Sequence, residues 1–140
     1  MNAETITKES DTSGVYFRRV VHDVSGNVVS DERVKRDPVL TFTQPEPTTL
    51  DEITGLTVVS VSFQLRDFDG DARTDSGEVR FRLQDRSAPA DEGVVFTRQL
   101  LGGALVLTLE MDAPGEYVLT IEPPLVADMQ LPEPVRVKVE

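Results

Sequence analysis

The sequence contains no cysteine, which excludes disulfide bonds, zinc–thiolate sites and cysteine nucleophiles. It has no tryptophan and only two tyrosines, so the carboxylate pairs that sugar hydrolysis would need have few aromatic rings beside them to hold a substrate. The single histidine, His22, leaves no histidine-rich metal site. No Gly-x-Ser-x-Gly motif accompanies it to suggest a catalytic triad. These absences predict a protein that is not an enzyme.

Long apolar runs are also missing, and no stretch approaches the roughly 20 apolar residues of a membrane-spanning helix. The N-terminus lacks the basic and apolar segments of a secretory signal, so we expect a chain made in the cytoplasm. Fourteen basic side chains stand against 25 acidic ones, for a formal charge of −11. That balance argues against nucleic acid and anionic membranes as partners, because binding to phosphates requires clustered Lys and Arg.

What the sequence does contain is a regular alternation of apolar and polar residues. In the run Thr57–Leu65, Val59, Val61, Phe63 and Leu65 share one face, and this period of two is typical of a strand with one buried face. Further runs of this kind, separated by turns rich in Gly, Asp and Pro, cover residues 39–43, 79–83, 94–101, 105–111, 117–121 and 135–139. So many half-buried strands predict two sheets packed face to face.

One segment carries a resemblance to a known family. Residues 105–121 contain Ala-Pro-Gly-Glu-Tyr between two alternating runs, and this pattern resembles the E–F corner of bacterial immunoglobulin-like domains. The resemblance covers about residues 38–140, although the cysteine pair and core tryptophan of many immunoglobulin domains are absent. It implies that Tyr117 packs at the corner with its hydroxyl bonded to nearby backbone, and it implies a scaffold without a particular activity. We therefore predict an all-β protein, an immunoglobulin-like antiparallel β-sandwich of about seven strands.

The N-terminal part differs from that core. Residues 1–14 are polar and aperiodic and predict a flexible tail. Residues 15–37 predict a hairpin arm that turns at Ser25-Gly26-Asn27. The arm holds five basic and four acidic side chains, whereas residues 38–140 hold eight and 18. We consider two alternatives, that the arm docks on a neighbouring molecule or that it pairs with a sheet of its own body. In the docking alternative the interface residues are Tyr16, Phe17, Arg18, Arg19, Arg33, Lys35 and Arg36.

An acidic loop gives the one candidate metal site. Its five carboxylates fall at positions 1, 3, 5, 9 and 12 of a twelve-residue segment, the side-chain spacing of an EF-hand-like calcium loop. However, Ala72 occupies the sixth position, where such loops need glycine, and strands flank the segment instead of helices. A solvated hairpin turn is the alternative. The candidate Ca²⁺ ligands are Asp67, Asp69, Asp71, Asp75 and Glu78.

These observations favour a non-catalytic structural protein that forms a homo-oligomer or joins a larger protein lattice. Its most specific form is an accessory protein of a bacterial virus, either capsid-decorating or tail-associated, made in the host cytoplasm and located in the virion. The alternative is a calcium-stabilised binding or spacer module of a bacterial surface protein. A small hydrolase is a third hypothesis, for which the sequence offers no catalytic set. No cofactor other than calcium is expected.

Overall fold

The computed structural model describes residues 2–88 and 92–140. The protein is all-β, with three antiparallel sheets, and among the described residues the one helical element is a short 3₁₀ turn, Val126–Asp128. The chain divides into two compact units, residues 1–37 and residues 38–140. This division lies at the boundary between the predicted arm and the predicted sandwich. No helix in the described part of the chain is long and apolar enough to cross a membrane.

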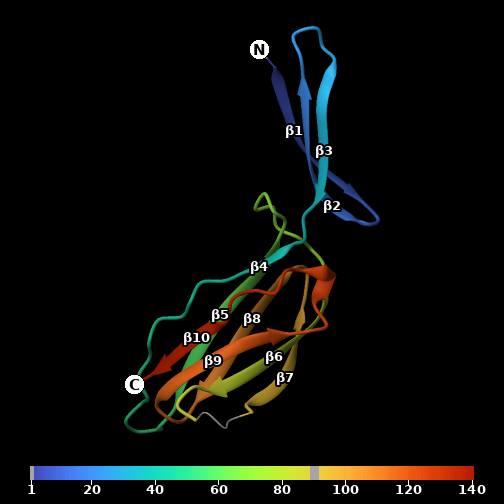
Figure 1. Cartoon of the computed structure of the whole chain (residues 1–140). Helices are drawn as coiled ribbons and strands as arrows, with labels where there is room; N and C mark the ends of the chain where they lie inside the picture. Colours follow the sequence, from blue (N-terminus) through green and yellow to red (C-terminus); the bar gives the residue numbers. More distant parts are fainter. Residues whose placement is uncertain (1, 89–91) are drawn as a thin grey trace. The chain divides into compact units, whose positions relative to one another are not determined.

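Unit 1, residues 1–37, is a three-stranded sheet in the order β1-β2-β3 (Figure 1). Its strands are β1 (Ala3–Asp11), β2 (Gly14–His22) and β3 (Val28–Lys35). The predicted turn after β2 is present, and the Asp23 carboxylate accepts hydrogen bonds there from the backbone N–H groups of Ser25 and Asn27 at 2.9 and 3.0 Å. Gly26 follows with φ +84°, a conformation that glycine adopts without strain.

The prediction of a flexible tail over residues 1–14 was wrong. Residues 3–11 pair with β2 along its whole length, from Ala3 opposite His22 to Asp11 opposite Gly14. The predicted two-stranded hairpin is therefore a three-stranded sheet. The strand β1 was missed because it lacks an apolar stripe. Its side chains instead form ion pairs with oppositely charged side chains of the neighbouring strands. The sheet is also separate from the other two, so the described strands of the arm do not extend a sheet of the body.

Unit 2, residues 38–140, contains the other two sheets. One has the order β4-β5-β8, from β4 (Val39–Thr41), β5 (Thr57–Arg66) and β8 (Ala104–Met111). The second has the order β10-β9-β6-β7, from β6 (Gly77–Asp85), β7 (Val94–Leu100), β9 (Gly115–Glu122) and β10 (Val135–Val139). Each alternating run found in the sequence of this unit corresponds to one of these strands, although the runs 39–43 and 94–101 extend past the ends of β4 and β7.

The core of unit 2 lies between its two sheets and is built from the inward side chains of both. Leu65 and Leu107 from one sheet and Phe81 and Leu100 from the other are 0% exposed. A row of rings crosses the core, with centroids 5.3 Å apart for Phe42–Phe63, 5.8 Å for Phe63–Phe81 and 5.5 Å for Phe81–Phe96. No polar side chain among the described residues is buried. Unit 2 is thus a sandwich-like body with an entirely apolar interior.

The segment after β4 crosses from one sheet to the other. β4 pairs with β5, but Thr48 forms a parallel bridge with Val139 of β10. The Thr48 N–H donates to the Lys138 carbonyl at 3.0 Å, and the Glu140 N–H donates to the Thr48 carbonyl at 2.8 Å. The segment therefore runs along the free edge of β10.

Candidate interaction surface

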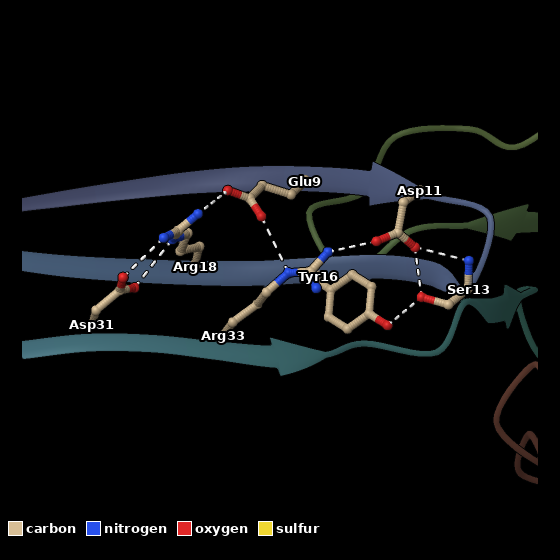
Figure 2. Close-up of polar contacts among 7 residues, drawn as sticks. All are labelled: Glu9, Asp11, Ser13, Tyr16, Arg18, Asp31 and Arg33. Carbon is tan, nitrogen blue, oxygen red and sulfur yellow. Dashed lines mark hydrogen bonds and ion pairs between the residues drawn. The ribbon is translucent and has the colours of Figure 1, made fainter.

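One face of unit 1 carries a network of ion pairs that spans all three strands (Figure 2). Arg18 of β2 lies opposite Arg33 of β3, and the repulsion between two facing cations is offset by carboxylates on both sides. Arg18 contacts Glu9 at 2.9 Å and Asp31 at 2.8 Å. Arg33 contacts Asp11 at 2.7 Å and Glu9 at 3.2 Å. Glu9 thus joins the two arginines, and each arginine is paired diagonally with carboxylates of the neighbouring rows.

Tyr16 and the β1–β2 turn extend this network. The Arg33 guanidinium lies 3.6 Å from the centre of the Tyr16 ring, within cation–π distance. The Tyr16 hydroxyl shares a hydrogen bond with the Ser13 hydroxyl at 2.5 Å, and the Ser13 N–H donates to Asp11 at 2.8 Å. The turn and both of its strands are therefore held by the same set of polar contacts.

These contacts shift the acid–base behaviour of the face. The Ser13 hydroxyl, and then the Arg33 guanidinium, hold the pKa of Asp11 well below its usual range. Hydrogen bonds from Arg18 lower the pKa of Glu9 and of Asp31. The side chains of these ion pairs are 32–43% exposed, so solvent screens each pair and its energy is small. The network specifies which residues face each other and adds little stability.

The opposite face of unit 1 is more apolar. The register places Ile6, Phe17, Val21 and Val34 there, and we call these four residues the apolar face. Ile6 is 57% exposed and Val34 is 49% exposed. Arg36 lies with its guanidinium 5.9 Å from the Phe17 ring. Among the described residues of the unit, only Val15 is buried. The sheet therefore has no core of its own.

The structure divides the predicted interface residues between the two faces. Tyr16, Arg18, Arg33 and Lys35 lie on the ion-paired face, whereas Phe17 and Arg19 lie on the opposite side of the sheet, where the Arg36 guanidinium is near the Phe17 ring. Sequence reasoning missed the partners that β1 supplies, because it assigned that segment to a tail. It also missed the apolar face itself. Residues 3–11 contain no apolar alternation that marks a strand, and their charges do not by themselves show which residues of β2 and β3 they meet.

The acidic loop does not assemble the predicted calcium ligands. Arg73, within the loop, donates to Asp67 at 2.9 Å and to Asp75 at 2.8 Å, so a guanidinium occupies the space between the first and ninth positions. Glu78 lies in β6, beyond the loop. No group of three or more His, Cys, Asp or Glu side chains in the described parts of the chain could hold a metal ion. This geometry favours the hairpin turn, and calcium binding stays a prediction.

The corner before β9 has the contact that the resemblance implied. The Tyr117 hydroxyl donates to the Ala113 carbonyl at 2.9 Å. Burial, and then the nearby Asp85 and Asp112 carboxylates, raise the pKa of Tyr117.

A groove of about 370 Å³ opens beside the same corner in unit 2. Segments from four parts of the chain line it, namely the crossing segment after β4, the residue that follows the end of β6, the start of β9 and the end strand β10. Its lining side chains are Gln44, Pro45, Pro47, Arg86, Glu116, Tyr117, Arg136, Val137 and Lys138.

Comparison with known proteins gives no family for this chain. No family model matches the sequence, and no curated protein matches it.

Proposed function

We propose that this chain is a non-catalytic structural protein that assembles with copies of itself, with unit 2 as the scaffold and unit 1 as the contact element. The observation that carries the proposal is the exposed apolar face of unit 1. A small sheet needs a covered apolar side to be stable, and Ile6 and Val34 are about half exposed. Another surface must therefore supply the missing core.

We take unit 2 to be an immunoglobulin-like sandwich. Three features support this assignment. The sheets have the strand orders β4-β5-β8 and β10-β9-β6-β7, the chain crosses from one sheet to the other after β4, and the Tyr117 hydroxyl bonds to backbone four residues upstream. A fold of this kind serves as a scaffold and leaves the function to its surfaces.

The surface that would cover the apolar face is the body of a second copy. Residues 1–37 hold six basic and seven acidic side chains, whereas residues 38–140 hold eight and 18, a net charge of −10. Two bodies repel each other, but an almost neutral sheet can approach a body without that cost. On the side of the apolar face, Lys8 and Arg19 are balanced by Glu4 and Glu32, and Arg19 pairs with Glu4 at 3.0 Å, so this side carries little net charge toward an acidic body.

The setting that we propose for this assembly is the virion of a bacterial virus, with the chain as a capsid-decorating or tail-associated accessory protein. This part of the proposal is an argument from fold, because immunoglobulin-like domains outside the secretory route commonly occur in virions. It depends on the assembly proposal and adds a location to it.

Light scattering coupled to size-exclusion chromatography tests the assembly. We expect the full chain to show a mass that is a multiple of 15.5 kDa and that rises with concentration. Ile6→Glu and Val34→Glu place a charge on the apolar face at exposed positions, and each should return the chain to the monomer mass.

Thr7→Glu is the matched control. It adds the same charge to the same sheet but on the ion-paired face, in the row of Arg18 and Arg33, and it should leave the assembly intact. A full chain that stays monomeric at every concentration would overturn the proposal. So would an oligomer that keeps the same number of subunits after deletion of residues 1–37.

A further inference from the structure

The free edge of β10 contains a gap in its hydrogen bonding. Backbone groups of its even-numbered residues face away from β9, since the Lys138 carbonyl and the Glu140 N–H bond to Thr48. The Gln44 side chain satisfies the next groups along, because its Oε1 accepts from the Arg136 N–H at 2.8 Å and its Nε2 donates to the Pro134 carbonyl at 3.0 Å. Between these two anchors, the Arg136 carbonyl and the Lys138 N–H have no partner among the described residues.

Two prolines explain the gap. Continuing the parallel pairing of Thr48 toward Gln44 would place the N–H and carbonyl of Glu46 opposite these two groups. Pro45 and Pro47 flank Glu46 and fix their own backbone angles, so this segment does not follow β10 as a strand. The groove of about 370 Å³ lies here, lined by both prolines and by the β10 residues whose backbone groups are unpaired.

The groove is also basic within an acidic unit. Arg86, Arg136 and Lys138 line it, against the single carboxylate of Glu116. Lys138 lies 3.7 Å from Glu140 and is half exposed. Arg86 and Arg136 form no ion pair with any described residue, although unit 2 has more than two acidic side chains for each basic one. Two guanidinium groups therefore remain available for carboxylates from outside.

We propose that this groove binds a short acidic peptide segment in extended conformation. One peptide residue fills the gap as a strand would, with its N–H donating to the Arg136 carbonyl and its carbonyl accepting from the Lys138 N–H. The Asp or Glu side chains on either side of that residue pair with Arg86 and Arg136. The site lies within unit 2, so it does not depend on the assembly role of unit 1.

The test is a titration of the ¹⁵N-labelled full chain with acetyl-Glu-Ala-Glu-amide, followed by NMR. We expect the largest amide shifts at Lys138 and its neighbours, since this N–H gains a hydrogen bond. Arg86→Gln and Arg136→Gln should each weaken binding roughly tenfold, because each removes one charge-assisted contact. Both variants should fold, since neither guanidinium has a partner in the described structure.

Two controls make the result specific. Arg98→Gln removes a surface arginine of β7 that does not line the groove, and it should bind the peptide as the native chain does. Acetyl-Gln-Ala-Gln-amide keeps the backbone and loses both charges, and it should bind at least tenfold more weakly. Absence of shifts at millimolar peptide would overturn the proposal, as would equal binding of the two peptides or equal weakening by Arg98→Gln.

Discussion

Both units of this chain are built from antiparallel strands, but different interactions hold the strands together in each unit. In unit 2 the alternating side chains close an apolar interior, in which Phe81 and Leu107 are fully buried. In unit 1 both faces of the sheet carry exposed side chains, and the strands are matched by charges around Arg18 and Arg33. The difference shows that ion pairs can specify a register without a core, whereas stability in water still depends on apolar burial.

This contrast predicts unequal stability along the chain. Exposed ion pairs contribute little free energy each, so unit 1 should open at lower cost than unit 2. The exposed apolar face of unit 1 is the part of the molecule that gains most from a partner. A weak sheet with an uncovered face is consistent with an element that becomes fully ordered on assembly.

The largest expected effect comes from removing a ring in each unit. Phe81→Ala leaves a cavity at the centre of the ring row and should lower the free energy of unfolding of unit 2 by about 3–5 kcal/mol. Phe17→Ala, on the apolar face of unit 1, should leave that free energy unchanged within about 0.5 kcal/mol. Urea unfolding followed by the amide signals of β5 and β8 measures both. Equal losses would show that the two units unfold as one.

Sequence reasoning located the strands of unit 2 because a strand with one buried face alternates apolar and polar residues with a period of two. Val59, Val61 and Phe63 alternate with Ser60 and Ser62, and this pattern has few other solutions. β1 carries no such signal, since its residues Ala3–Asp11 include a single large aliphatic side chain, Ile6. Its pairing depends on which charge meets which across the sheet, and that becomes visible only when the register is known.

The candidate sites show the same limit. Arg18 and Arg33 were selected as interface residues from charge alone, but the sequence did not reveal that Glu9 and Asp31 already pair with them. In the acidic loop, the spacing of carboxylates indicated a cation site. In the structure, the Arg73 guanidinium of the same loop pairs with two of these carboxylates. Short-range spacing identifies which groups are near each other, but the backbone path decides which of them meet.

The second largest expected effect is a difference between the two units in their stability at low pH. The pKa of Glu4 is lowered by Arg19, that of Glu9 by Arg18 and that of Asp11 by Ser13 and Arg33. A lowered folded-state pKa contributes stability that is complete above the ordinary value of 4.5 for Glu or 3.8 for Asp and is lost as the pH falls through the folded value. We therefore expect the NMR signals of β1–β3 to lose dispersion between pH 5 and pH 2, ahead of those of β5 and β8.

Sodium chloride at neutral pH provides the control for this titration. High salt screens exposed ion pairs and leaves the apolar interior of unit 2 in place, so it should loosen unit 1 and leave unit 2 folded. If the signals of both units disappear at the same pH, the charges are not what distinguishes them.

A smaller effect is expected in the acidic loop. Arg73→Gln removes the ion pairs with Asp67 and Asp75. Because all three side chains are only partly exposed, this change should lower the free energy of unfolding of unit 2 by about 1–2 kcal/mol. In calorimetric titration we expect no heat from millimolar Ca²⁺ with the native chain, since the Arg73 guanidinium already pairs with two of the five carboxylates. Heat from Ca²⁺ binding to the native chain would restore the calcium-loop hypothesis.

The smallest effect compares the two tyrosines, one in each unit. Tyr117→Phe removes the hydrogen bond to the Ala113 carbonyl and should lower the free energy of unfolding of unit 2 by about 1 kcal/mol. Tyr16→Phe removes an exposed hydroxyl contact with Ser13 and should change only the local opening of the β1–β2 turn. Amide exchange at neutral pH resolves both, because the first change acts through global unfolding of unit 2 and the second through unit 1 alone. If Tyr117→Phe has no effect on β9 exchange, the corner contact does not stabilise the sandwich. The difference in stability between the units would then be due to the apolar core of unit 2 alone.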